Sequence, residues 1–251
     1  MKALCFTLKG KTAFFKKPEV NSYYYFTYGN IHKVALLGMF GAILGYGGYT
    51  QQNRNREKQK ELEAGYPEFY EKLKGLQISI CPKAERGFIP KKIQMFNNSV
   101  GYASQEQGGN LIVKEQWLEN PSWEIAVLLD SEQARQLADF ITAHKCIYVP
   151  YLGKNDHAAD IVEVRTVEVT KMENGSGIIS SLFLKESAHI LESRGLTQIN
   201  PISFKYQESL PVSLDEWTNN YGLERFIYTD AKVSWEQQNV YSVEEKLKMF
   251  F

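Results

Sequence analysis

The sequence predicts an α+β protein, and three observations support this fold class. Residues 2–8 alternate between two sets of apolar side chains, as a β-strand does. Residues 34–44 form an apolar run of helical length that ends at a cluster of glycines. Residues 161–251 are rich in segments with strand periodicity. With 251 residues and 43% hydrophobic side chains, the chain is long enough for one large domain, or for a domain with a smaller companion.

The first strand and the first helix follow directly from these patterns. One face of residues 2–8 carries Ala3, Cys5 and Thr7, and the other carries Leu4, Phe6 and Leu8. Because both faces are mostly apolar, we expect a central strand. In the helix over residues 34–44, Gly38 and Gly41 share one face with Gly45 just beyond its end. A glycine inside a helix costs about 1 kcal/mol relative to alanine, so this pattern indicates a packing or binding reason.

The next segments predict a mixture of short elements. Residues 51–63 are polar and predict a surface helix or a mobile connection. Pro67 predicts the start of a short helix that ends at Leu73, and residues 76–81 predict a second strand that ends at Pro82. Residues 83–117 are basic and polar with several glycines, which predicts a projecting hairpin inserted between core elements.

A third strand, a second helix and a fourth strand complete the predicted core. Residues 124–129 predict the third strand, after which we expect Asp130 to cap a helix with Gln133 at the capping-box position. The apolar stripe of this helix consists of Ala134, Leu137, Ala138 and Ile141. Residues 146–149 predict a short fourth strand, stopped by Pro150. The order strand, helix, strand, strand, helix, strand is that of the ferredoxin-like fold, which RNA-recognition domains also use.

These elements suggest two units along the chain. We interpret residues 1–160 as a ferredoxin-like (RRM-like) palm, with a thumb hairpin inserted at about residues 83–117. Residues 161–251 are interpreted as a β-rich C-terminal subdomain. Within it, residues 162–170 alternate strictly, and residues 178–184 are candidates to pair with them across a turn at Asn174 and Gly175. Residues 226–235 are candidates for further strands.

Charge and cysteine usage limit the possible functions. Residues 1–100 carry 16 Lys and Arg against 7 Asp and Glu, whereas the rest of the chain carries 13 against 22. This split favours a polyanion as the partner of the N-terminal half, with scattered surface lysines as the alternative. Cys5, Cys81 and Cys146 lie far apart, which indicates reduced cysteines in an intracellular, cytoplasmic protein without a metal site. The apolar run over residues 34–46 is too short for a membrane span, which needs about 20 residues.

Three motifs resemble a known family. Residues 38–45, GMFGAILG, are similar to the glycine-rich helix of the fifth Cas protein family, whose members belong to the RAMP superfamily and bind RNA in the type I CRISPR surveillance complex, Cascade. Residues 16–18, KKP, resemble the family's basic element that ends in proline. Residues 151–159, YLGKNDHAA, resemble its second signature. The resemblance extends through most of the chain and is nearest in character to the type I-B branch, although residues 31–34, IHKV, depart from the common pattern.

The resemblance implies a specific role in antiviral defence. Family members hold the 5′ handle of the guide crRNA on the palm, and the thumb interrupts the start of the guide region. They lie at the foot of the complex, where they contact the large subunit and the first backbone subunit, and they meet target DNA only through the complex. In most branches a separate endoribonuclease cuts the repeat RNA, which implies binding without catalysis and without a cofactor here.

The residue types agree with a single-stranded RNA site. Such RNA is held by cations along its phosphates and by aromatic rings under its bases. The loop over residues 9–33 supplies both kinds of side chain, and the start of the following helix offers free backbone N–H groups to a phosphate. The candidate RNA-binding residues are Lys9, Lys16, Lys17, Tyr28, His32, Lys33, Gly45, Tyr46, Lys91, Lys92, Asn97, Asn98, Tyr102, Lys154, Asn155 and His157.

Each assignment has an alternative. Tyr23, Tyr24 and Tyr25 are equally compatible with a strand that has alternate rings in the core. As a thumb, Lys91, Lys92, Asn97 and Asn98 would contact phosphates, and Met95, Phe96 or Tyr102 would be a wedge between bases. The alternative is an ordinary solvated hairpin. The rival function is a metal-independent endoribonuclease, for which Tyr46, Lys154, His157 and His32 have suitable chemistry. A protein-interaction scaffold without RNA is a third class, which leaves the basic aromatic loop unexplained.

Overall fold

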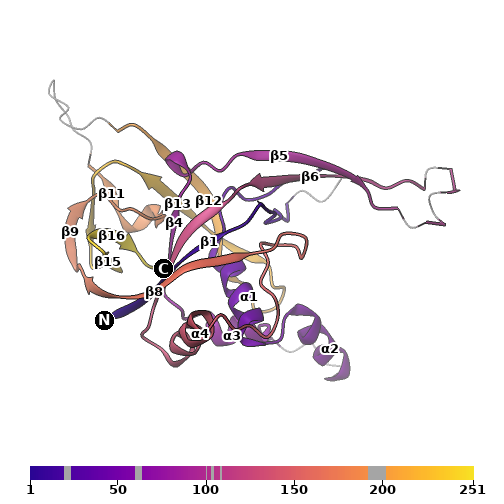
Figure 1. The fold of residues 1–251 in the computed structure, drawn as a ribbon, viewed down its shortest axis with the longest axis horizontal. Helices are drawn as coiled ribbons and strands as arrows, with labels where there is room; N and C mark the ends of the chain where they lie inside the picture. The colour runs from indigo at the N-terminus through magenta and orange to yellow at the C-terminus, as the bar shows by residue number, and fades with distance from the viewer. Residues whose placement is uncertain (20–23, 60–63, 100, 103–104, 108, 192–201) are drawn as a thin grey trace.

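The computed structural model describes residues 1–19, 24–59, 64–99, 101–102, 105–107, 109–191 and 202–251. Parts of three predicted features lie outside these residues. They are Tyr23 of the aromatic loop, residues 60–63 of the polar segment, and residues 100, 103–104 and 108 of the thumb hairpin. The described residues form both helices and strands, and strands predominate, so the predicted α+β class is confirmed (Figure 1).

The centre of the fold is a six-stranded antiparallel sheet, here named the palm sheet, with the strand order β16-β15-β8-β1-β7-β4. Its strands are β1 (Lys2–Lys9), β4 (Ile78–Pro82), β7 (Ser122–Leu128), β8 (Asp160–Lys171), β15 (Val240–Val243) and β16 (Lys246–Met249). Along the chain, β1, α1 (Lys33–Leu44), β4, β7, α4 (Glu132–Thr142) and β8 follow in the predicted order of strands and helices. Helices α2 (Tyr49–Gln59) and α3 (Glu68–Leu73) stand between α1 and β4, and Figure 1 shows all four helices on one side of the sheet.

Strand β1 lies between β7 and β8 and buries both of its faces, as its sequence predicts. Leu4, Phe6 and Leu8 belong to the main core, which α1, α3 and α4 also share. Ala3 and Cys5 face the opposite way and pack in a second cluster with residues of β7, β8 and β15. The alternation of side chains along a strand therefore fixes which face receives the helices.

Helix α1 begins and ends where its sequence provides caps. The Nδ1 atom of His32 accepts a hydrogen bond from the backbone N–H of Ala35, as an N-cap side chain does. Gly45 follows the last turn with φ of 82°, a left-handed conformation that glycine adopts without strain, and its N–H returns to Ala42. No helix in the described part of the chain is long and apolar enough to cross a membrane.

The predicted fourth strand at residues 146–149 is wrong. This segment forms no strand, because the backbone N–H groups of Ile147 and Tyr148 donate to the last carbonyls of α1, at Ile43 and Ala42. The fourth strand of the core is β8, which pairs with β1 over most of its length. The predicted boundary between residues 160 and 161 therefore falls near the start of a strand that belongs to the palm sheet.

Two further details of the prediction also need correction. The N-cap of α4 is Ser131, not Asp130, because the Ser131 hydroxyl accepts the N–H of Ala134. The predicted apolar stripe of α4 is buried as expected. Residues 178–184 do not pair with β8 across Asn174 and Gly175, since β9 (Asn174–Gly177) pairs with β14 (Val233–Glu236) and β8 pairs with β15.

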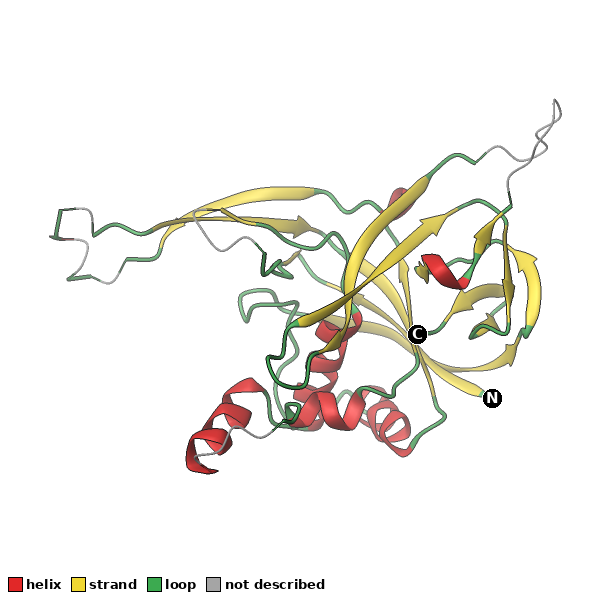
Figure 2. Cartoon of the chain, turned by 180° about the vertical axis from the view of Figure 1, so that it is seen from behind, coloured by secondary structure: helices red, strands yellow, loops and turns green. Residues whose placement is uncertain are grey.

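The hairpin predicted at about residues 83–117 is present, and its second strand continues to Glu119. It consists of β5 (Lys91–Asn97) and β6 (Ile112–Glu119), which follow the 3-10 turn η1 (Glu85–Gly87). Figures 1 and 2 show this hairpin extending far beyond the rest of the chain. Its base is joined to the palm because β6 also pairs with β2 (Thr12–Ala13) and β3 (Tyr24–Tyr25).

The C-terminal part is rich in strands, as predicted. One sheet has the order β10 (Phe183–Leu184), β13 (Tyr221–Thr229) and β12 (Lys205–Leu214). The other has the order β11 (His189–Ile190), β14 and β9, and the 3-10 turn η3 (Lys185–Ser187) lies between β10 and β11. Phe183, Ile227 and Trp235 are among the residues of the core that these sheets share.

Candidate nucleic-acid interface

A pocket of about 810 Å³ opens over one face of α1, and we name it the α1 pocket. Its lining includes one stripe of the helix, formed by Val34, Ala35, Gly38, Met39 and Ala42. These residues recur at the spacing that places side chains on one helix face. Because three of the five are alanine or glycine, a ligand can approach the helix backbone closely here.

The three glycines that the sequence places on one face have different roles. Gly38 lines the pocket, and a Cβ atom added there meets only the Phe69 ring, at 3.9 Å. Gly41 instead packs directly against the Cβ of Phe69, so it allows α3 to approach α1. Gly45 is the helix cap, where Ile147 lies 3.0 Å from the position of a Cβ. Only Gly38 therefore opens space for a ligand.

Nine aromatic rings contribute to the pocket wall, and six of them, all tyrosines, are at least partly exposed. They come from the loop before α1, from the segment around α2 and α3, from the segment after α4 and from the C-terminal sheet. The nine are Phe14, Phe15, Tyr25, Tyr46, Tyr49, Phe69, Tyr148, Tyr151 and Tyr221. Rings of this kind provide stacking surfaces for nucleobases, each worth roughly 1 to 3 kcal/mol.

Two lysines and one carboxylate are the charged groups among the described residues of the pocket lining. The Nζ of Lys16 lies 4.1 Å from the centre of the Tyr25 ring, and the side chain is exposed. The Nζ of Lys154 lies 3.0 Å from both carboxylate oxygens of Glu115. The Lys16 side chain is therefore exposed at the pocket, and the Lys154 side chain is 33% exposed in its ion pair with Glu115.

Both candidate histidines near this site are buried. His32 is 3% exposed, and burial lowers its pKa to about 3, so its ring is neutral and serves as the helix cap. His157 is 1% exposed, and its Nδ1 lies 2.6 Å from the Thr12 hydroxyl. Burial, followed by the charge of Lys154, lowers the pKa of His157. Both rings therefore favour the uncharged form and have almost no exposed surface.

Three other candidates surround the pocket without lining it. Tyr28 is almost fully buried, and the Nζ of Lys17 lies 5.1 Å from the centre of its ring. Lys17 also lies 3.7 Å from Glu208, which accepts hydrogen bonds from the N–H of Gly29. Lys33, in the first turn of α1, is half-buried, and burial lowers its pKa to about 8.

The candidate residues of the thumb hairpin lie away from the α1 pocket. Tyr102 is 76% exposed near the hairpin end, and Lys91 is exposed at the start of β5. Lys92 lies 3.8 Å from Glu119, and Asn97 accepts the N–H of Ser99. The remaining candidates outside the pocket are Lys9, Gly45, Asn98 and Asn155.

The structure therefore brings together four of the predicted residues in one pocket, namely Lys16, His32, Tyr46 and Lys154. The sequence patterns did not indicate four further pocket residues, Tyr49, Phe69, Tyr148 and Tyr221. No local motif marks these four rings, because they come from four segments that only the fold brings together. Tyr148 was assigned to the incorrect fourth strand, which would have placed it in the sheet.

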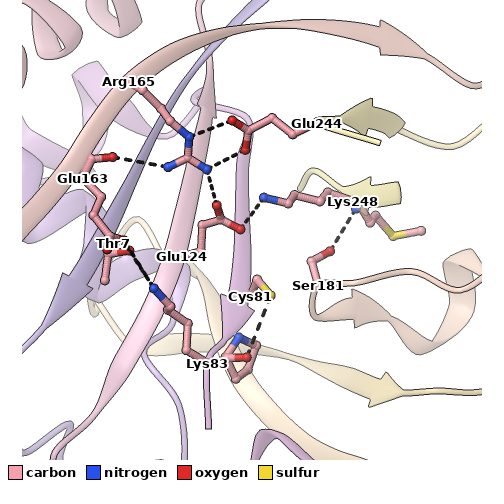
Figure 3. A network of polar contacts seen from close by, with 11 residues as sticks. Thr7, Cys81, Lys83, Glu124, Glu163, Arg165, Ser181, Glu244 and Lys248 are labelled. Carbon is pink, nitrogen blue, oxygen red and sulfur yellow. Dashed lines mark hydrogen bonds and ion pairs between the residues drawn. The ribbon is translucent and has the colours of Figure 1, made fainter. Parts of the chain in front are cut away.

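The helix-free face of the palm sheet is closed by ion pairs (Figure 3). Glu124 contacts both Lys248 and Arg165 at 2.6 Å, and Arg165 also pairs with Glu244. Burial would raise the pKa of Glu124, but the hydrogen bonds and charges of Lys248 and Arg165 lower it overall. Lys83 and Glu163 extend this network at its edge. The network and the second core cluster cover the sheet face, so the α1 pocket on the helix side is the more open candidate site.

Comparisons with known proteins identify the fold. No family model matches the sequence, and no curated protein matches it. Among solved structures, a chain described as "CRISPR RNA-guided surveillance complex" matches with a TM-score of 0.53 and 13% identity, over 91% of this chain and 90% of that one. A CRISPR protein from Archaeoglobus fulgidus matches with a TM-score of 0.50 and 12% identity, over 99% of both chains. The fold is one that CRISPR proteins use. At this identity the likeness extends to the fold and not to individual site residues.

Proposed function

We propose that this protein is a non-catalytic RNA-binding subunit of a CRISPR effector complex and that it holds the 5′ handle of the crRNA. The observation that carries the proposal is the α1 pocket, in which six partly or fully exposed tyrosines and the exposed Lys16 surround the helix face that carries Gly38. Stacking surfaces beside a cation are the combination that single-stranded RNA requires. The shared fold with a chain of an RNA-guided surveillance complex supports the same function.

The finer assignment combines the motifs with this geometry. The resemblance of residues 16–18, 38–45 and 151–159 to the fifth Cas family supports a place in a type I complex, and its character favours type I-B. In such a complex the chain contacts the backbone subunit and the large subunit, and it meets target DNA only through them. The long thumb hairpin provides surface for these contacts in addition to RNA (Figure 2). A cytoplasmic location follows from this role.

Binding without cleavage is favoured over an endoribonuclease by the state of the candidate catalytic groups. A base and an acid for RNA cleavage must reach the ribose and the leaving oxygen. His32 and His157 are both buried, and Lys154 is paired with Glu115. Tyr46 donates a hydrogen bond to Gln136. These four groups therefore serve internal contacts, which supports a subunit that binds RNA and does not cut it.

The test is RNA binding by a protein whose pocket is filled. Gly38→Leu adds a side chain where only the Phe69 ring lies within 4 Å, so the variant keeps the helix and occupies the pocket. The matched control is Gly75→Leu, at a glycine with nothing within 4 Å and outside the pocket. We expect Gly38→Leu to weaken binding of a labelled repeat-derived RNA at least tenfold, and Gly75→Leu to bind as the wild type does. Equal affinities for the two variants would contradict the proposed site, and a defined RNA product formed in the presence of EDTA would contradict the non-catalytic assignment.

A further inference from the structure

Glu115 is the one carboxylate among the described residues that line the α1 pocket. It lies on β6 at the base of the thumb hairpin, opposite Tyr25 of β3. Its side chain is 7% exposed and accepts hydrogen bonds from Trp117 Nε1 at 2.7 Å and from Lys154 Nζ. Burial of a charged carboxylate costs free energy unless hydrogen bonds and a cation compensate the charge. Glu115 therefore needs the ion pair with Lys154 to remain buried and charged.

The position of Lys154 is also fixed by its surroundings. Gly153 adopts φ of 101° with its Cα against the carbonyl oxygen of Phe14, a contact that no residue with a Cβ could make. The Nζ of Lys154 then lies 5.7 Å from the Phe14 ring centre and 5.3 Å from that of Phe96. If Lys154 turned to a phosphate in the pocket, it would leave these rings and uncover a buried, unpaired carboxylate.

We propose that Glu115 excludes phosphate from the thumb side of the α1 pocket, so that this side receives an uncharged part of a nucleotide, its base or ribose. The phosphates of the same RNA then lie on the side of Lys16. This inference rests on the proposed function and adds to it. Glu115 neutralises the charge of Lys154 within the protein. Lys154 therefore contributes ring contacts and an ion pair to the pocket wall, and does not bind a phosphate.

The salt dependence of RNA affinity tests this role. Each phosphate neutralised on single-stranded RNA contributes about 0.7 to the slope of log affinity against log salt. Glu115→Gln keeps an acceptor for Trp117 and leaves Lys154 with the exposed carboxylate of Asp156, 3.8 Å away. The Lys154 side chain is 33% exposed and can then turn toward solvent. We expect this variant to bind a repeat-derived RNA more tightly at low salt, with a slope steeper by about 0.7 than that of the wild type.

Two further variants keep the outcome unambiguous. The double variant Glu115→Gln with Lys154→Gln removes the released cation and should return the slope to the wild-type value. Glu168→Gln changes the net charge equally at a 72% exposed side chain of β8, where Met1 and Lys2 are its ion-pair partners, and should leave the slope unchanged. An unchanged slope for Glu115→Gln, with RNA binding by the wild type intact, would overturn this inference alone. Absence of any RNA binding by the wild type would overturn the proposed function together with it.

Discussion

The Nζ of Lys248 lies 2.6 Å from Oε2 of Glu124, and the lysine side chain is only 2% exposed. This pair joins β16 to β7 across the helix-free face of the palm sheet, and Arg165 of β8 binds the other oxygen of the same carboxylate (Figure 3). Removing one partner of a buried ion pair leaves the other charge without compensation. Glu124 therefore links the Lys248 side chain of β16 to β7, in addition to the backbone pairing that joins β15 to β8.

Glu124→Gln should lower the free energy of unfolding by about 3 kcal/mol, because the buried Lys248 then loses its counter-charge. The measurement is urea denaturation at neutral pH. Glu168→Gln is the matched control, since it removes a carboxylate that is 72% exposed and should change stability by less than about 0.5 kcal/mol. A loss of less than about 0.5 kcal/mol in both variants would contradict this prediction, because it would show that Lys248 does not need Glu124 as its counter-charge.

His32 should make the fold sensitive to mild acid. Burial lowers its pKa from 6.5 to about 3, so between these values the unfolded chain binds a proton that the folded chain does not. The contribution of neutral His32 is complete above pH 6.5 and is lost as the pH falls, at up to about 1.4 kcal/mol per pH unit.

The variant His32→Asn isolates this effect, because asparagine keeps an N-cap acceptor but does not titrate. Urea denaturation at pH 7 and pH 5 should show a loss of stability in the wild type that exceeds the loss in His32→Asn by about 2 kcal/mol. If the two proteins lost the same stability between these pH values, His32 would be accessible to protons in the folded state.

The two glycines inside α1 should respond oppositely to alanine. Gly38→Ala should stabilise the fold by up to about 1 kcal/mol, since its Cβ has room and alanine favours a helix. Gly41→Ala should destabilise it by about 1 to 3 kcal/mol, because its Cβ meets that of Phe69 and α3 must shift. Thermal unfolding of both variants checks the pair, and a change of the same sign in both would refute the different roles assigned to these glycines.

Lys16 should contribute one phosphate contact. Lys16→Gln is expected to weaken binding of a repeat-derived RNA and to reduce the salt slope by about 0.7. The control is Lys2→Gln, at an exposed lysine of β1 that lies 3.8 Å from Glu168 and outside the pocket. Fluorescence anisotropy over a series of salt concentrations measures the slope of log RNA affinity against log salt for both variants. Equal slopes for the two variants would show that Lys16 does not contact a phosphate.

Much of the fold could be predicted from the sequence because its signals are local. The alternation in residues 2–8 gave the two faces of β1, and the glycine at position 45 marked the end of α1. The misplaced fourth strand has a physical reason. Residues 146–149 have strand-forming side chains, but their backbone donors bind the end of α1, a long-range contact that propensity does not reveal.

The site was less predictable than the fold for the same reason. Lys16 and Tyr46 lie close in sequence to the glycine-rich helix and could be assigned from that position. Phe69, Tyr148 and Tyr221 reach the pocket from segments far along the chain. The ion pair of Glu115 could not be predicted either, because its partner, Lys154, lies 39 residues further along the chain and no pattern near Glu115 indicates the contact.

The central position of β1 also bears on how the chain folds during synthesis. Its two neighbours, β7 and β8, begin at Ser122 and Asp160, so β1 leaves the ribosome long before either partner exists. Pairing between such distant segments is slow, because the intervening chain must close a large loop first. Until then β1 exposes an apolar segment, and chaperones would protect the nascent chain from aggregation.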